Sequence, residues 1–383
     1  MKKNTVKISI LLLICQFSAA WLYAEPNFTL PIIRERFVLK RLYTKAKSFG
    51  VFSEVIVNTN TRPDARNEFI STDKRVLEVA INPDASRGAV TMLINGFPRI
   101  FFLSPSENIL TEFSFRRGVR DESPIITADG KTLFFVTDRY QNREIFSIDI
   151  EKRELNFVID NMADNFQPSI SADGNILAYV SYKDGGKSVI FVYNRSSKQE
   201  IAVSLPELSS SHPKISSDGN FIVFEGIDDE GNKEIYLANV KEKSLINLSD
   251  NYKIDELPDI ARDAKRIVFQ SWRSEEPEIF MYDMGSQEIY NISLDPNAKD
   301  INPAISDDGN IVVWESYSKW VTSSIKAVNL SSKTVYNFYQ LDEYKTRPIL
   351  SRDGSKLVYF MKDYPYITDL PKAMGTGKTS ATN

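Results

Sequence analysis

Six residues stand directly before the proline of a phrase that recurs along the chain: Ser123, Gln167, His212, Leu257, Asn302 and Arg347. They differ from copy to copy, so the repeated fold does not require them. A repeated architecture that gathers them at one rim would let a hydroxyl, two amides, an imidazole and a guanidinium bind a small ligand or peptide. Arg347 is the strongest candidate, because a guanidinium can clamp a carboxylate through two hydrogen bonds. The alternative is a water-filled channel whose side chains satisfy one another.

The phrase that positions these residues reads Pro-Ile-Ile-Thr-Ala-Asp-Gly at 124–130. It recurs five times, and successive prolines are 44, 45, 45, 45 and 45 residues apart. A period near 45 filled with short apolar strands is typical of a β-propeller with one blade per repeat. In each copy Asp accepts turn hydrogen bonds and Gly supplies a positive φ. One copy carries Ala264 in place of Gly, which predicts a strained turn there.

A second series sets the number of blades. The strand after the polar loop begins at Glu54, Arg99, Glu144, Val189, Glu234, Glu278 and Ser324. A shortened phrase at Pro83 adds a unit before the first full copy. We therefore predict an all-β fold, a propeller of seven four-stranded blades over residues 51–365. N-terminal strands near 54–58 and 67–71 would complete the last blade, which begins at Pro348, and so remove two open sheet edges. Six blades remain the alternative if the Pro83 unit is not a full blade.

The N-terminus has the composition of an export signal. Lys2 and Lys3 precede an apolar core at 8–14, and Ala24 ends a small-residue cleavage site, so residues 1–24 are predicted to be a signal peptide. The protein would then be periplasmic or otherwise exported. The only cysteine, Cys15, lies inside this signal, as an incidental apolar residue or, alternatively, as the lipidated cysteine of a lipoprotein.

Charge is distributed unevenly between the N-terminal arm and the rest of the chain. The formal net charge is −4, and an acidic, mixed surface argues against nucleic-acid binding. Residues 25–50 form a basic arm, predicted to be a short amphipathic helix or an extended segment. Its part at 25–47 either docks on an acidic partner or an anionic membrane surface, or packs on the acidic propeller. Residues 366–383 are predicted to be a flexible tail, and Gly375 to Thr379 lack the strand and helix of a phosphate-binding loop.

Catalytic motifs are sparse. His212 is the only histidine, and no Gly-x-Ser-x-Gly elbow occurs. No Cys/His cluster for a metal exists, so we predict no cofactor and no metal. Asp121, Asp255 and Asp300 each precede a proline by three residues; they either cap turns or serve as rim carboxylates of an enzyme. Acidic turns at 228–230 and 307–308 are predicted to be solvated rather than to bind calcium.

The repeat resembles a known family. Pro-x-x-Ser-x-Asp-Gly, followed by an apolar strand and Glu-Ile-Tyr/Phe, is similar to the WD40-like (PD40) repeats of the TolB propeller family, over about residues 54–361. This resemblance implies a periplasmic, non-enzymatic propeller that docks onto envelope proteins such as a peptidoglycan-associated lipoprotein. It is specific for the repeat type, and less so for function.

The same repeats also resemble the propellers of prolyl-oligopeptidase-type enzymes and of lyases that act on sugar acids. The former need a hydrolase domain, and the latter rely on several channel histidines with a bound metal. We therefore predict an exported, non-catalytic propeller that binds an envelope protein or peptide through its channel mouth and loops. The alternative is a propeller that binds a small molecule or glycan, or an enzyme that uses carboxylates at the rim.

Overall fold

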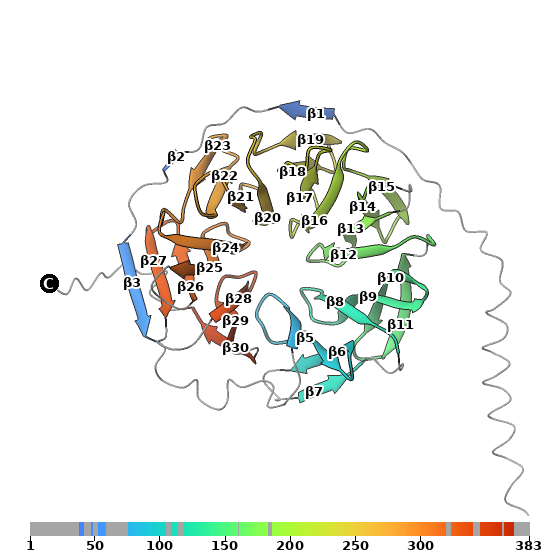
Figure 1. Ribbon diagram of the computed structural model, residues 1–383. Helices are drawn as coiled ribbons and strands as arrows, with labels where there is room; N and C mark the ends of the chain where they lie inside the picture. Colours follow the sequence, from blue (N-terminus) through green and yellow to red (C-terminus); the bar gives the residue numbers. More distant parts are fainter. Residues whose placement is uncertain are drawn as a thin grey trace, which may run out of the picture.

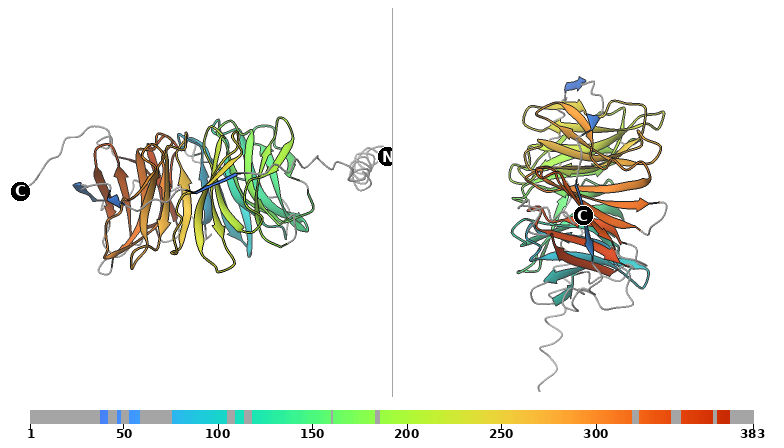
Figure 2. Two further views of the ribbon diagram at one scale, coloured as in Figure 1. Left: turned by 90° about the horizontal axis from the view of Figure 1, so that it is seen from above. Right: turned by 90° about the vertical axis from the view of Figure 1, so that its left-hand side faces the viewer.

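Seven sheets stand like blades around a central channel in a computed structural model of the protein (Figure 1). The structure describes residues 38–41, 47–48, 53–58, 76–104, 109–113, 118–159, 161–182, 186–318, 323–339, 345–361 and 364–370. Seen from the side, the ring is a flat disc one strand length thick (Figure 2). Within the described ranges, no helix is long and apolar enough to cross a membrane. The predicted seven-bladed propeller is confirmed.

The first three blades are antiparallel sheets of four strands in chain order. Blade 1 holds β4 (Val76–Ile81), β5 (Gly88–Ile94), β6 (Phe97–Ser104) and β7 (Ile109–Glu112). Blade 2 holds β8 (Asp121–Ile126), β9 (Thr132–Tyr140), β10 (Asn142–Asp149) and β11 (Glu154–Ile159). Blade 3 holds β12 (Asn165–Ile170), β13 (Ile176–Ser181), β14 (Val189–Asn194) and β15 (Gln199–Ala202).

The remaining blades follow the same order. Blade 4 holds β16 (Ser209–Ile215), β17 (Phe221–Ile227), β18 (Lys233–Asn239) and β19 (Ser244–Asn247). Blade 5 holds β20 (Asp255–Ile260), β21 (Arg266–Ser271), β22 (Glu278–Asp283) and β23 (Glu288–Asn291). Blade 6 holds β24 (Ala298–Ile305), β25 (Ile311–Ser318), β26 (Ser324–Asn329) and β27 (Thr334–Tyr339). In the described residues blade 7 holds β28 (Lys345–Leu350), β29 (Lys356–Met361) and β30 (Tyr364–Asp369).

The hydrophobic core lies between neighbouring blades rather than at the centre of the ring. The second strands of the blades are largely buried on both faces, so each holds an apolar run such as residues 267–269 of β21. One cluster joins Ile235 and Leu237 of blade 4 to Ile267 and Phe269 of blade 5. Each blade therefore stabilises the next, and the inner strands line the channel.

The Asp-Gly turns take the geometry that the sequence predicts. Gly130, Gly174, Gly219, Gly309 and Gly354 have φ between 67° and 76°. Ala264 occupies the same turn with a φ of 55°, a conformation that costs an L-residue about 1–2 kcal/mol. The methyl group of Ala264 is nevertheless buried in the core between blades 4 and 5.

Replacing Ala264→Gly should therefore leave the free energy of unfolding unchanged or raise it by up to about 1 kcal/mol. Relief of backbone strain contributes about 1–2 kcal/mol, and loss of one buried methyl costs about 0.8 kcal/mol. Urea denaturation of the two proteins measures the difference. A clear drop in the denaturation midpoint would show that the turn does not need glycine.

The N-terminal strand does not complete the last blade, contrary to our prediction. β3 (Ser53–Asn58) pairs in parallel with β27 on the outer edge of blade 6. The third strand of blade 7 is β30, which follows β29 directly and pairs with it antiparallel. A hairpin closes a far shorter loop than pairing with a strand near residue 54 would, so it loses less chain entropy. β30 also extends past the predicted propeller boundary at 365, whereas the predicted strand at 67–71 lies outside the described residues.

The N-terminal segment forms a belt on the outside of the ring, seen in blue in Figure 1. β1 (Val38–Arg41) pairs in parallel with β19, and β2 (Lys47–Ser48) pairs in parallel with β23. With β3, the belt covers the outer edges of blades 4, 5 and 6 in succession. The described parts of the predicted basic arm are thus strands on the propeller, not a helix.

Candidate functional site

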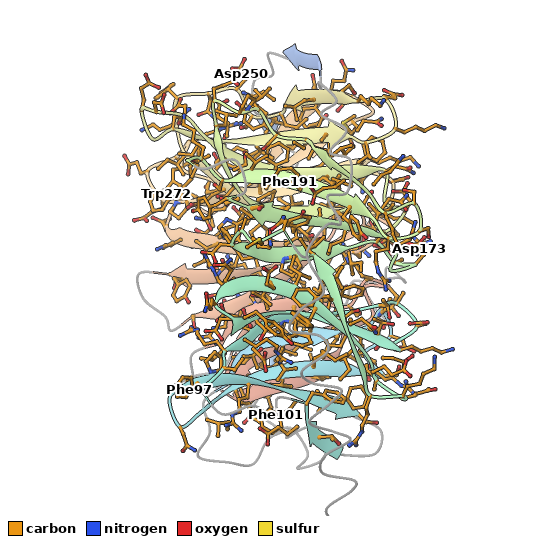
Figure 3. All side chains as sticks on the ribbon, turned by 90° about the vertical axis from the view of Figure 1, so that its right-hand side faces the viewer. Phe97, Phe101, Asp173, Phe191, Asp250 and Trp272 are labelled. Carbon is orange, nitrogen blue, oxygen red and sulfur yellow. The ribbon has the colours of Figure 1, made fainter. Side chains whose placement is uncertain are left out.

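The two faces of the disc differ because every inner strand runs through the channel in the same direction. The first residues of each inner strand lie at one face of the disc, here called the mouth. The Asp-Gly turn that follows the strand lies at the other face, here called the exit. Figure 3 shows Asp173 of one such turn on the exit face, and Trp272 and Phe97 on the opposite face. The six residues predicted from the phrase lie at the mouth.

All six predicted residues share one backbone conformation. Ser123, Gln167, His212, Leu257, Asn302 and Arg347 have φ between 49° and 56°. At each of them the inner strand shifts register against the second strand of the blade, so that two residues of the inner strand lie opposite one residue of the second. This is a β-bulge, which turns the side chain of the bulged residue away from the ladder. The proline that follows cannot donate a ladder hydrogen bond, and a bulge is one of the few strand positions that tolerate this.

Polar side chains from the preceding blade satisfy the amides that the bulges free. The acceptors are carboxylate or amide oxygens at 2.6–3.3 Å. The pairs are Glu78 with Ser123, Gln167 with His212, Glu225 with Leu257, Gln270 with Asn302, and Glu315 with Arg347. Much of the polarity of the mouth therefore holds the ring together, a role that the sequence analysis did not assign to Gln167.

The cavity of the channel includes only part of the predicted set. Its volume is about 500 Å³, and His212, Leu257 and Asn302 line it. The Asn302 amide is held by Glu315 at 2.8 Å. Ser123 and Gln167 contact their neighbours in the ring instead. Arg347, the residue we expected to bind a carboxylate, lies 3.3 Å from the carbonyl oxygen of Leu77 and 5.2 Å from the ring centroid of Phe360. It joins blade 7 to blade 1.

The residues that follow the prolines of blades 2 to 7, and Ala80 at the matching position of blade 1, line the middle of the channel, here called the waist. They are Ala80, Ile125, Ser169, Lys214, Asp259, Ala304 and Ile349. Blades 3 to 5 give this layer a polar wall, and the other blades give it an apolar one. Ser169 and Asp259 accept hydrogen bonds from the amides of Ile215 and Ile305, respectively. Lys214 is exposed to the channel, and in the described part of the chain no carboxylate lies within ion-pairing distance of it.

Polar contacts link several blades at the exit. Ser217 of blade 4 donates to Asp307 of blade 6 at 2.5 Å, and Arg262 of blade 5 pairs with Asp307 at 3.1 Å. Arg352 of blade 7 donates to the carbonyl oxygen of Ile260 in blade 5 at 3.2 Å. The network spans four of the seven blades, and Ser217, Arg262, Asp307 and Arg352 line the exit end of the cavity.

His212 and Glu225 form the one imidazole–carboxylate pair of the chain. Nδ1 of His212 lies 3.1 Å from Oε1 of Glu225, in a bent contact, and the His212 side chain is 42% exposed. Burial pushes the pKa of Glu225 upward, but contacts with His212 and with the amide of Leu257 outweigh it and hold the pKa below its usual value. Glu225 is thus ionised, and Nδ1 of His212 lies beside it without a hydrogen bond.

The three aspartates that precede prolines are buried strand residues, not turn caps. Asp121 pairs with Arg139 at 2.9 Å, and Asp255 pairs with Arg273 at 2.9 Å. Asp300 is fully buried, and both of its carboxylate oxygens lack a hydrogen bond. Burial, partly offset by Lys326, raises its pKa to about 6. None of the three lines the cavity, so they do not act as rim carboxylates.

Family comparison agrees with the repeat. Residues 156–370 match the sequence model of the TolB β-propeller domain, more than half of the chain. The chain belongs to the TolB β-propeller family. The resemblance that the sequence predicted is confirmed. No curated protein matches this TolB-family chain.

Three solved structures that superpose with TM-scores above 0.6 are enzymes. An oligogalacturonate lyase from Vibrio parahaemolyticus superposes with a TM-score of 0.64 at 11% identity, covering 80% of this chain and 94% of that one. An oligogalacturonate lyase in complex with manganese superposes with a TM-score of 0.64 at 14% identity, covering 81% of this chain and 94% of that one. A prolyl endopeptidase superposes with a TM-score of 0.61 at 16% identity. The match covers 82% of this TolB-family chain and 50% of the endopeptidase. Identities this low show a shared fold.

These matches overturn our prediction of a non-catalytic protein that binds envelope partners. The single histidine and the lack of a hydrolase motif had led us to favour a non-catalytic protein and to keep an enzyme as the alternative. Propellers of enzymes nevertheless match this TolB-family chain with TM-scores above 0.6, and two of them do so over 94% of their own length. The alternative, a glycan-binding or catalytic propeller, accords better with these findings.

Proposed function

We propose that the channel binds a small, carboxylate-bearing sugar and that the protein is an exported, glycan-acting propeller. The observation that carries this proposal is Lys214, which lies at the waist of a cavity of about 500 Å³ and has no carboxylate partner among the described residues. The other channel cations, Arg262 and Arg352, contact Asp307. A ligand carboxylate is the natural partner for Lys214, because a partly desolvated ion pair is stronger than one in water.

The waist also suits the rest of a sugar ring. The apolar wall, formed by Ile125, Ile349 and Ala80, offers a surface for the C–H groups of the ring. Ser169 on the polar wall and Asn302 at the mouth can meet hydroxyl groups. A mainly apolar pocket with a few placed polar groups is the usual design of small-ligand sites.

The His212–Glu225 pair supplies a candidate for proton transfer. Nδ1 of His212 faces Glu225, so the other ring nitrogen is the candidate general base for a bound ligand. A ligand whose carboxylate is held by Lys214 has an acidified C–H bond next to that carboxylate. His212 would take this proton, and the C–H electron pair would form a carbon–carbon double bond as the bond to the oxygen substituent on the next carbon breaks. The leaving oxygen would take up a proton from water. The lyases that share the fold act, by name, on oligogalacturonate, a chain of such acidic sugars.

No step of this proposal involves a metal. Across the described residues, no group of three His, Cys, Asp or Glu side chains could hold one, so the donor set does not fit the manganese of the similar lyase. Export remains part of the proposal and rests on the signal-like residues 1–24. Contact of residues 25–47 with an envelope protein or an anionic membrane stays a prediction.

A matched pair of ligand series tests the proposed function. Short galacturonate oligomers should raise the melting temperature of the protein, while galactose oligomers of the same length should not. Appearance of the ultraviolet absorbance of an unsaturated uronate would establish the lyase reaction, and His212→Asn should abolish it without lowering galacturonate binding. Equal response to both series, or to neither, would contradict the proposal.

A further inference from the structure

Exposed apolar side chains gather on the outer edge of blade 2. Tyr140, Leu155, Phe157 and Met162 are 58%, 42%, 43% and 78% exposed, respectively. The ring of Phe157 lies 4.1 Å from that of Phe146, and Tyr140 stacks on Phe146 at 5.9 Å. Tyr140 and Phe157 thus form an apolar surface over Phe146, and Leu155 lies on the same face of the outermost strand, β11, as Phe157. Surfaces of this kind mark interaction sites more often than scattered apolar residues do.

The edge of β11 is also open. The belt strands cover the outer edges of blades 4, 5 and 6, but in the described part of the chain no strand pairs with the outer side of β11. β11 has six residues, as many as β27, which receives the six-residue strand β3. β7 and β15 have only four each. An uncovered edge of this length presents free N–H and C=O groups to another strand.

We propose that β11 pairs with β11 of a second copy of this chain, antiparallel about a two-fold axis at Asn156. The sequence of the strand is self-complementary in this register, because Leu155 faces Phe157 of the second copy and the reverse contact forms as well. Leu155 and Phe157 lie on one face of β11, since Phe157 pairs with Phe146 and Leu155 with Ile148. The pairing would join two blades into one continuous sheet and bury the apolar surface.

Charge supports a second copy as the occupant. The turn and strand start at 151–154 carry two acids and two bases, Glu151, Lys152, Arg153 and Glu154. This edge is therefore locally neutral, although the whole chain carries a net charge of −4. Two copies meet here without like-charge repulsion, which natural edges otherwise use to prevent pairing.

A single-cysteine experiment tests the register. In a Cys15→Ser background, Asn156→Cys should form a disulfide-linked dimer on mild oxidation, because self-paired residues have Cα atoms about 4.5–5.5 Å apart. Glu154→Cys is the control. In the same register its two copies stand about 13 Å apart along the strands, too far for a disulfide. Cross-linking at 154 but not at 156 would overturn the proposed pairing.

Sedimentation of the full chain tests the interface itself. We expect a dimer for the native chain and a monomer for Phe157→Lys, with unchanged circular dichroism. Leu294→Lys, at an exposed apolar residue of another blade edge loop, should leave the dimer intact. A native chain that stays monomeric at its highest soluble concentration would refute the proposal, and so would a dimer that survives Phe157→Lys. A monomer that instead binds an added strand-forming peptide would also refute it.

Discussion

Asp300→Asn should stabilise the protein by about 3 kcal/mol near pH 8, the largest gain we expect from any single substitution. Asp300 is fully buried without a hydrogen bond to its carboxylate, and its pKa is raised to about 6. Because its pKa in the unfolded chain is near 3.8, the folded state holds the proton more tightly. This stabilising effect is complete below about pH 4, declines as the pH rises, and is lost above about pH 6. Asparagine remains neutral throughout.

The comparison of two pH values isolates the carboxylate. At about pH 4.5 the gain from Asp300→Asn should fall to about 1 kcal/mol, as measured by urea denaturation. A second variant uses the pattern of the other blades, where Arg139 and Arg273 stand 18 residues after Asp121 and Asp255 and pair with them. In blade 6 that position is Ser318, so Ser318→Arg should also stabilise the protein near neutral pH. A gain that does not depend on pH would show that the charge of Asp300 is not the cause.

Arg347→Ala should destabilise the ring by about 2 kcal/mol. The guanidinium donates to the carbonyl oxygen of Leu77 at 3.3 Å and lies over Phe360, so it links the last blade to the first. Hydrogen bonds from a charged donor contribute about 1.5–3 kcal/mol, and a cation–π contact adds about 0.5–1 kcal/mol. Truncation also leaves the backbone of blade 1 with an unsatisfied acceptor at the closure.

Two further variants separate closure from loss of charge. Arg347→Lys keeps the cation over Phe360 but not the guanidinium geometry, so it should lose about half as much stability as Arg347→Ala. Arg120→Ala, at a side chain that is 55% exposed, should change stability by less than about 0.5 kcal/mol. If Arg347→Ala denatures at the same urea concentration as the native chain, the residue is not a closure contact.

The repeat phrase made the ring predictable because each of its residues has a local role that recurs. Pro, Asp and Gly fix a bulge and a turn, and 45 residues suffice for one blade of four short strands. The position of Lys214 could also have been predicted. The residue after each proline lies two places after the bulged residue. Alternation along a strand therefore directs its side chain toward the channel, as at the bulge.

Other features had no signal in the sequence. The strand at 54 has the pattern of a third blade strand, but β30 competes with it for the edge of β29. β29 and β30 close a much shorter loop, and this difference in loop length decides the pairing. β1 and β2 are too short to show a periodic pattern. The role of Arg347 was also hidden, because its contacts are backbone atoms more than 250 residues away.

The affinity of a galacturonate oligomer for the native chain and for Lys214→Gln tests the central claim most directly. Calorimetry should show binding to the native chain that weakens at least about tenfold in Lys214→Gln, equal to about 1.4 kcal/mol. Lys241→Gln, at an exposed lysine outside the channel, should bind like the native chain. Equal affinity of the native chain and Lys214→Gln would contradict the assignment of the channel as an acidic-sugar site.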